Sequence, residues 1–322
     1  ANGFFNVPGI SVHVLYPSGQ VSKLQEKQFT TLGGNITALE VDGSFDDCQA
    51  LVKQAFADEA LRERLVLTSA NSINLARFLP QSFYYFRGWG QMDVDELVVA
   101  VPSGNFGNLT AGLVAREMGL PVNTFLAASN ANDVVPEYLE TTKYRPRSSV
   151  RTVANAMDVG SPSNFERILD LFDQRHERIV QHLKGYRYSD VQIKGVIKEV
   201  YQKHGYTLDP HGATGFEAAR EYLLASMSTP GSSPDGPSGK TSEKNSAQRS
   251  YSPENVPIAH HSTKVLFLET AHPAKFPEVV NEATGAEVET PERLKAFAKG
   301  EKVSQKISTE YETFRDYLSN LH

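Results

Sequence analysis

A short apolar run followed by a glycine-rich turn constrains this chain more than any other stretch of its sequence. Residues 97–101 read Leu-Val-Val-Ala-Val, which is typical of a strand buried on both faces of a parallel sheet. Residues 102–107 read Pro-Ser-Gly-Asn-Phe-Gly. A predicted helix follows and ends before Gly119, with the good helix formers Leu109, Ala111, Leu113, Ala115, Arg116 and Glu117. A strand, a tight turn and a helix in this order predict a parallel α/β fold.

The same turn predicts a site for an anion. Backbone N–H groups in the first turn of a helix have no intrahelical acceptor, and the helix dipole adds partial positive charge there. Gly104 and Gly107 let the backbone approach a phosphate more closely than a Cβ would allow. The turn has neither the Lys-Ser/Thr pair of a nucleotide P-loop nor a G-x-G-x-x-G pattern, which argues against ATP and NAD. On these residues alone, an ordinary βα turn is the alternative.

Apolar runs alternate with helical patterns along most of the chain. The runs predict strands at residues 12–16, 36–41, 66–68, 97–101, 124–128 and 265–268. The helical patterns cover residues 24–29, 45–64, 75–90, 109–117, 165–172, 191–201 and 210–224. This alternation predicts doubly wound parallel sheets in two lobes, with ligands at the carboxyl ends of the strands. We assign residues 1–75 to a partial small lobe and residues 76–322 to a large, ligand-binding lobe.

Composition excludes several classes of protein. The 32 basic and 38 acidic residues are mixed throughout the chain and give a net charge of -6, so no nucleic-acid-binding surface is predicted. No apolar stretch approaches the length needed to span a membrane. The single cysteine, Cys48, rules out an intramolecular disulfide and fits a cytoplasmic protein. Because Cys48 falls in a helical apolar pattern, we expect it to fill the core.

Two segments depart from the regular alternation. Residues 227–263 are rich in Ser, Pro and Gly and predict a low-complexity surface insertion. His260 and His261 at its edge lack partners at metal-ligand spacing, so no metal site is predicted. Residues 1–9 read like the tail of a helix entering a connection, and the first methionine is Met92. We therefore expect the sequence to be a fragment that is truncated at its N-terminus.

A second candidate phosphate site lies in residues 69–77. Asn71 and Arg77 are six positions apart across a predicted helix start. The Asn71 amide donates hydrogen bonds, and the planar fork of Arg77 suits a phosphate. A helix-capping asparagine and a solvated arginine are the alternative. Two anion sites at one edge of a sheet favour a phosphorylated cofactor beside a phosphorylated substrate.

Several motifs together resemble those of threonine synthases, and the likeness is to the longer-chain subclass of many bacteria and of fungi. The four main motifs are Leu-Thr-Ser-Ala-Asn-Ser-Ile-Asn at 67–74, Val-Pro-Ser-Gly-Asn-Phe-Gly at 101–107, Asn-Ala-Met-Asp-Val at 155–159 and Thr-Ala-His-Pro-Ala-Lys-Phe at 270–276. The resemblance runs in order from residue 1 to about residue 284. It implies the tryptophan-synthase-β-like fold of pyridoxal-phosphate enzymes of fold type II. It also implies the conversion of O-phosphohomoserine and water to threonine and phosphate.

The resemblance implies a cofactor role for five residues. Gly104, Asn105, Phe106 and Gly107 match the loop that surrounds the phosphate of pyridoxal phosphate. Thr270 matches the hydroxyl residue that faces the pyridine nitrogen. A hydroxyl does not enforce protonation of that nitrogen as a carboxylate does, which moderates the cofactor as an electron sink.

The resemblance also implies a substrate-binding role for the second site. Asn71 and Arg77 match positions expected to hold the substrate phosphate, and Ser72 and Asn74 are weaker candidates. The family's Schiff-base lysine lies in a Phe-Lys-Asp motif followed by Thr-Ser-Gly-Asp-Thr-Gly, and neither motif occurs in these 322 residues. Because the reaction needs a lysine for proton transfer between carbons, we expect the chain as given to be inactive alone and its full-length parent to be active.

Two alternative functions stay open on the sequence. One is another fold-type-II lyase such as a serine/threonine dehydratase, although the substrates of those enzymes carry no phosphate. The other is a truncated, non-catalytic paralogue that keeps the phosphate sites for binding or regulation. In each case we expect a small-molecule ligand and a monomer or homodimer.

Overall fold

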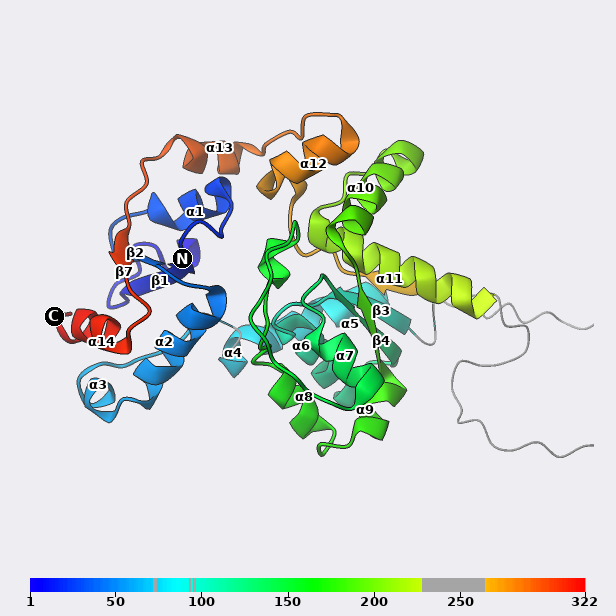
Figure 1. The fold of residues 1–322 in the computed structure, drawn as a ribbon, viewed down its shortest axis with the longest axis horizontal. Coiled ribbons are helices and arrows are strands. Elements are labelled where there is room, and N and C mark those ends of the chain that lie inside the picture. Colours follow the sequence, from blue (N-terminus) through cyan, green and yellow to red (C-terminus); the bar gives the residue numbers. More distant parts are fainter. Residues whose placement is uncertain (72–73, 93, 95–96, 228–263, 322) are drawn as a thin grey trace, which may run out of the picture.

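The computed structural model describes residues 1–71, 74–92, 94, 97–227 and 264–321. Within these residues the chain builds two separate sheets (Figure 1), with strand orders β1-β2-β7 and β5-β4-β3-β6. All neighbouring strands in both sheets are parallel. The predicted α/β fold with parallel sheets is therefore confirmed.

The first sheet lies beside both ends of the chain (Figure 1). Its region contains β1 (Val12–Pro17), α1 (Lys23–Thr30), β2 (Ile36–Val41), α2 (Phe45–Ala57), α3 (Glu59–Arg64), α13 (Glu292–Lys299), β7 (Gln305–Ile307) and α14 (Tyr311–Ser319). Apolar side chains of β2, α2 and α14 share one core, which includes Leu39, Leu51 and Phe314. Cys48 belongs to this core and is 4% exposed, so its predicted role in packing is confirmed.

The last residues of the chain return to the first sheet, although the sequence analysis assigned residues 76–322 to one lobe. β7 pairs with β2, and α14 packs against α2 and α3. Lys302, just before β7, places its Nζ 2.6 Å from a Glu26 carboxylate oxygen and 2.8 Å from a Glu40 oxygen. The division of the chain into two lobes stays a prediction. β7 has only three residues, too few to give a recognisable apolar pattern.

The second sheet is covered by helices on both faces. Its strands are β3 (Leu97–Pro102), β4 (Val122–Ser129), β5 (Leu183–Arg187) and β6 (Val265–Phe267). Helices α5 (Ser82–Gly90), α6 (Gly107–Glu117), α7 (Val134–Thr141), α8 (Phe165–Leu171) and α9 (His176–His182) supply one core, and α10 (Asp190–His204), α11 (Pro210–Met227) and α12 (Pro277–Thr284) supply the other. Val99 faces the first of these cores and Ala100 the second, as the alternation of a strand requires. Burial on both faces explains the continuous apolar run of β3 and confirms the doubly wound arrangement.

The order of the strands identifies where this sheet can hold a ligand. From β3 the chain adds β4 and then β5 on one side, and it returns to add β6 on the other side of β3. The direction of winding therefore reverses at β3. In open parallel sheets, ligands bind beyond the carboxyl ends of the strands at such a switch point.

Three predicted elements differ from the structure, and one strand of the second sheet was not predicted. Residues 66–68 are not a strand: Val66 is fully exposed, and none of the described strands pairs with this segment. The predicted helix at 45–64 divides at Asp58, whose side chain accepts a hydrogen bond from the Leu61 amide and begins α3. The predicted helix at 75–90 divides near Pro80 into α4 (Leu75–Phe78), a short 3₁₀ turn and α5. Strand β5 was not predicted, because Leu-Lys-Gly-Tyr-Arg has no apolar run.

Two predictions fall on residues that the structure does not describe. The predicted insertion begins at the last residue of α11, and the rest of it, with His260 and His261, lies outside the described residues. Within the described part of the chain, no helix has the length and apolar character that a membrane crossing requires.

Candidate active site

The turn after β3 is buried and leads into a helix without a capping side chain. Ser103 is 2% exposed and Phe106 is 3% exposed. Phe106 is the N-cap residue of α6, has a φ of 62° in the left-handed region, and makes no side-chain capping hydrogen bond. Amide donors in the first turn of α6 lack intrahelical acceptors. A buried helix start of this kind suits an anion.

Backbone from a distant segment forms the floor of this turn. A Cβ placed on Gly104 would lie 2.6 Å from the Cα of Met157 and 3.2 Å from the carbonyl oxygen of Ala156. Because the first distance is shorter than any real Cβ contact with backbone, only glycine fits at position 104. We call residues 154–158 the floor segment.

A half-buried carboxylate, that of Asp158, holds the floor segment in place. Asp158 accepts hydrogen bonds from the Thr152 amide at 2.9 Å and from the Thr152 hydroxyl at 2.7 Å. The side-chain amides of Asn130 and Asn132, which follow β4, also donate to it at 2.8 and 3.2 Å. Burial raises the pKa of Asp158 to about 6, although the hydrogen bonds from Thr152 and Asn130 act in the opposite direction.

The start of α8 holds the other side of the turn. The Asn105 side-chain oxygen accepts hydrogen bonds from the Ser163 amide at 2.7 Å and from the Ser163 hydroxyl at 3.0 Å. The Asn105 carbonyl oxygen accepts a hydrogen bond from the Asn164 side-chain amide at 2.9 Å. Asn164 is fully buried and is the N-cap residue of α8, yet its side chain does not cap that helix. It is directed to the turn instead.

The segment that carries Thr270 leaves the sheet next to this turn. Ala100 of β3 pairs with Phe267 of β6, and the Leu268 amide donates to the Ala100 carbonyl at 3.0 Å. Parallel neighbouring strands end at the same edge, so Thr270 and the Gly104–Gly107 turn both lie at the switch point. Thr270 is exposed there.

Asn74 and Arg77, two of the candidate substrate-phosphate residues, form hydrogen bonds with residues close to them in the sequence. Asn74 caps α4, because its side-chain oxygen accepts a hydrogen bond from the Ala76 amide at 3.0 Å. Its side-chain amide donates to the Ser69 carbonyl at 2.9 Å. Arg77 donates from Nε to the Ala70 carbonyl at 3.1 Å, which leaves its two terminal nitrogens directed elsewhere. Asn74 is therefore the N-cap of α4, whereas the alternative interpretation had given the capping role to Asn71.

The structure places this segment near the glycine turn. Helix α4 packs against α6, the helix that begins at Gly107. Asn71 and Arg77 are both exposed, and Ser72 lies outside the described residues. The end of the segment, residues 75–77, and the last residue of the turn, Gly107, therefore belong to two helices that touch each other.

The comparisons with known proteins agree with this arrangement. Residues 6–232 match the family model of pyridoxal-phosphate dependent enzymes, and residues 247–318 match the model of the threonine synthase C-terminal region. The chain is 39% identical to a threonine synthase of Haemophilus influenzae and 40% identical to one of Escherichia coli, in each case over 99% of this chain and 67% of the relative. It thus spans about two thirds of the length of these relatives.

Solved structures give the same result. The crystal structure of threonine synthase from Escherichia coli superposes with a TM-score of 0.84 over 99% of this chain and 67% of that one, at 39% identity. A structure of pyridoxal-phosphate-bound threonine synthase from Brucella melitensis superposes with a TM-score of 0.76 over 98% of this chain and 66% of that one, at 30% identity. This chain belongs to the threonine synthase family. The predicted resemblance, the fold type and pyridoxal phosphate as the cofactor are confirmed.

A buried acid–histidine pair lies next to Glu269, the residue before Thr270, in this threonine synthase family member, and the Asp209 amide donates to the Glu269 carboxylate at 3.3 Å. Asp209 is fully buried and caps α11, because it accepts hydrogen bonds from the His211 and Gly212 amides at 2.8 and 3.3 Å. His211 Nδ1 lies 2.6 Å from Asp209. Its Nε2 accepts the Ala156 amide at 3.3 Å, which places the ring hydrogen on Nδ1. Burial beside Asp209 raises the pKa of Glu269.

A cavity of about 490 Å³ adjoins the same strand end. It is lined by Tyr206, Thr207, Glu269, Ala271, His272, Pro273, Val288, Glu289 and Pro291. His272 also accepts a hydrogen bond from the Ala274 amide at 3.1 Å, and the Lys275 carbonyl accepts one from the Ser22 hydroxyl at 3.1 Å. These contacts give a structural role to the His272 side chain and to the Lys275 backbone.

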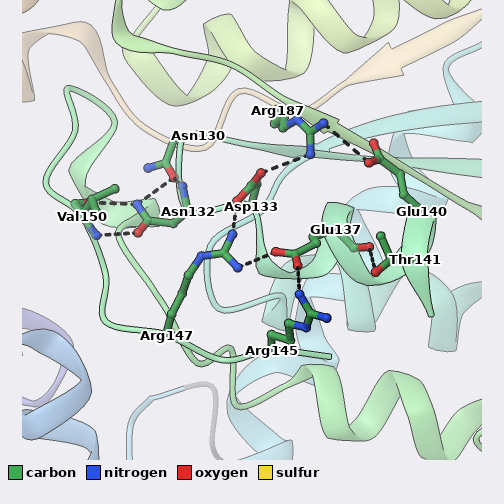
Figure 2. Close-up of polar contacts among 10 residues, drawn as sticks. All are labelled: Asn130, Asn132, Asp133, Glu137, Glu140, Thr141, Arg145, Arg147, Val150 and Arg187. Atoms are coloured by element: carbon green, nitrogen blue, oxygen red, sulfur yellow. Dashed lines mark hydrogen bonds and ion pairs between the residues drawn. The ribbon is translucent and has the colours of Figure 1, made fainter. Parts of the chain in front are cut away.

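Figure 2 shows the polar contacts that anchor the chain leading to the floor segment. Asn132 donates to the Val150 carbonyl at 2.9 Å and accepts a hydrogen bond from the Val150 amide at 2.7 Å. Arg147 forms ion pairs with Asp133 and Glu137, which lie at the start of α7. These contacts fasten residues 147–150 to the end of β4, close to where the floor segment begins.

The local sequence did not indicate a role for the residues that contact the turn. Ser163 and Asn164 directly precede the helical pattern predicted at 165–172, and Asp158 was named only as part of a family motif. An asparagine before a helix normally caps that helix, so nothing in the local pattern of Asn164 indicated a contact 59 residues away. The motif at residues 155–159 was the one available signal for the floor segment.

Proposed function

We propose that this chain supplies both phosphate sites of an enzyme that converts O-phosphohomoserine and water to threonine and phosphate. The observation that carries the proposal is the contact between α6, whose buried start has no capping side chain, and α4, which presents the exposed Arg77. One helix start suits a permanently bound phosphate, and the neighbouring arginine suits one that enters and leaves.

The residues at the switch point fit pyridoxal phosphate, the cofactor of this family. The amides of the Gly104–Gly107 turn would hold its phosphate, with Asn105 and Phe106 shaping the turn, and the Thr270 hydroxyl would face its ring nitrogen. Gly104 and Met157 are in direct backbone contact, which keeps the turn close to the sheet. When bound, the cofactor supplies an electron sink for carbanion chemistry.

The substrate phosphate is assigned to the segment 69–77. Asn71, Ser72, Asn74 and Arg77 would bind it, with Arg77 contributing charge-assisted hydrogen bonds. Within the described part of the chain, the terminal nitrogens of Arg77 form no ion pair with a carboxylate. The guanidinium is therefore available to a dianionic ligand, and Nε is already oriented by the Ala70 carbonyl.

The direct test is turnover of O-phosphohomoserine by protein expressed from its complete reading frame, because the Phe-Lys-Asp motif is not among the 322 residues. We expect threonine and inorganic phosphate in equal amounts, measured by chromatography and a phosphate assay. Release of a 2-oxo acid from serine or threonine, with no use of the phosphorylated substrate, would identify a dehydratase. A reading frame without the lysine motif, together with absent turnover, would identify a non-catalytic paralogue.

The remaining expectations about the setting of the enzyme stay predictions. They are the cytoplasmic location and the monomeric or homodimeric state. Gel filtration of the same protein, with and without pyridoxal phosphate, measures the second.

A further inference from the structure

We propose that Arg167 is a positioning residue that links the two phosphate sites, so that one side chain sets the affinity for cofactor and for substrate together. The proposal rests on the function proposed above. Arg167 itself contacts neither ligand. Arg167 acts through Asn164 on the glycine turn and through Phe78 on the helix that carries Arg77.

The first half of the link runs from Arg167 to the cofactor turn. Arg167 Nη1 donates to the Asn164 side-chain oxygen at 2.5 Å, one turn away on α8. This bond fixes the orientation of the Asn164 amide, whose nitrogen then donates to the Asn105 carbonyl at 2.9 Å. Because Asn164 is fully buried, its amide has no access to water as a substitute partner. Loss of the guanidinium therefore loosens the hold on Asn105.

The second half of the link runs from Arg167 to the substrate helix. The Arg167 guanidinium carbon lies 5.3 Å from the centre of the Phe78 ring, within the range of a cation–π contact. Phe78 is 1% exposed and directly follows Arg77 in α4. Since α4 has only four residues, Leu75–Phe78, its orientation depends on what Phe78 packs against. Arg167 thus contributes to the packing that sets the orientation of α4 and of Arg77 on it.

Arginine has the chemistry that both contacts need. Its planar guanidinium stacks on an aromatic ring while its edge donates hydrogen bonds, which a lysine ammonium cannot do at the same time. The link also predicts that a bound cofactor favours binding at the substrate site. A cofactor that immobilises the turn holds Asn105, Asn164 and Arg167 in one arrangement, and this arrangement supports Phe78 beneath the substrate site.

The experiment compares Arg167→Met with the wild type, each expressed from the complete reading frame. Two dissociation constants are measured, that of pyridoxal phosphate by absorbance titration and that of inorganic phosphate on the cofactor-loaded protein by calorimetry. We expect Arg167→Met to raise both by about 3- to 10-fold, the size of one hydrogen bond or cation–π contact. The KM for O-phosphohomoserine should rise by a similar factor, while kcat changes by less than about 2-fold.

A double-mutant cycle separates this role from general stabilisation. Asn164→Ala should weaken cofactor binding by itself, and adding Arg167→Met should weaken it by less than about 2-fold more, because Arg167 acts through Asn164. Arg167→Lys should recover less than half of the loss. The control is Arg178→Met on α9, an arginine that pairs with Asp173. It should leave both dissociation constants unchanged.

Three results would overturn the proposal. They are a lower melting temperature with both dissociation constants unchanged, an effect confined to one ligand, and fully additive effects on cofactor binding in the cycle. Failure of the proposed function is distinguishable from these, because it appears as absent turnover in the wild type. The two dissociation constants report on the link whether or not turnover occurs.

Discussion

The turn after β3 and the segment 69–77 are both proposed to bind a phosphate, yet the chain builds them in opposite ways. The turn is mostly buried and is fixed by three distant parts of the chain: Met157 beneath it, the start of α8 beside it, and β4, whose Ala128 carbonyl accepts the Ser103 amide at 2.8 Å. The segment 69–77 is largely exposed. The side-chain hydrogen bonds of Asn74 and Arg77 span no more than seven positions.

This difference matches the residence times that the two phosphates need. A preformed turn pays little conformational entropy on binding, which favours a cofactor that stays in place. A substrate must enter and its phosphate product must leave, which favours an exposed site on a short helix. We infer that the rigidity of each site is set by how far along the chain its supporting contacts come from.

The largest expected effect tests the rigidity of the turn. In Gly104→Ala the new Cβ would overlap the Met157 backbone, which cannot move as a side chain would. We expect loss of measurable pyridoxal phosphate binding by absorbance, and a fall in the free energy of unfolding of about 1–3 kcal/mol. Normal cofactor affinity in this variant would show that the floor segment yields, and the comparison would fail.

The matched control is the same substitution where space is open. Gly195 lies inside α10, and a Cβ there meets no atom within 4 Å. Gly195→Ala should raise the free energy of unfolding by about 0.5–1 kcal/mol, because alanine loses less backbone entropy in a helix. Cofactor binding should not change.

A smaller effect tests the exposed segment. Arg77→Met removes the charge-assisted hydrogen bonds proposed for the substrate phosphate, so the KM for O-phosphohomoserine should rise about 10- to 100-fold while cofactor absorbance persists. Arg62→Met on α3 is the control, because Arg62 is an exposed arginine that lies 4.0 Å from Glu59. Loss of cofactor with an unchanged KM would mean that the two sites have been exchanged.

Local patterns in the sequence predicted the core of the candidate site. The apolar run of β3 is continuous because helices bury both of its faces, and the glycines that follow mark the close backbone approach seen at Gly104. The Thr270 segment was predicted at the same edge because parallel strands end together. These features depend only on residues close together in the sequence or on the geometry of a parallel sheet.

The supporting contacts were not predicted, because they join residues far apart. Met157 lies 53 positions after Gly104, and Asn164 lies 59 positions after Asn105. Nor does the composition of residues 305–307 indicate that they pair with β2. Segment 66–68 shows the reverse case, in which a strand was predicted and none formed. Its apolar residues satisfy a strand pattern, but in the described structure no strand lies beside it to accept its hydrogen bonds.

The smallest expected effect concerns Asp158, which supports the turn and titrates. We expect the stability of the floor segment to depend on pH, whereas that of the exposed segment should not. The pKa of Asp158, about 6 in the folded chain, exceeds the ordinary value of 3.8, so the folded state binds the proton more tightly than the unfolded state does. The free energy of unfolding should therefore fall as pH rises from about 4 to about 6 and then level off. We expect a change of about 1 kcal/mol, below the full value of about 1.4 kcal/mol per pKa unit because the carboxylate is partly open to solvent.

Urea unfolding of wild type and Asp158→Asn between about pH 4 and about pH 6 measures this change, since the variant should lose this component of the slope. Asp170→Asn on α8, an exposed position, should keep the wild-type slope. If the free energy of unfolding varies with pH equally in Asp158→Asn and wild type, protonation of Asp158 does not affect the stability of the floor segment.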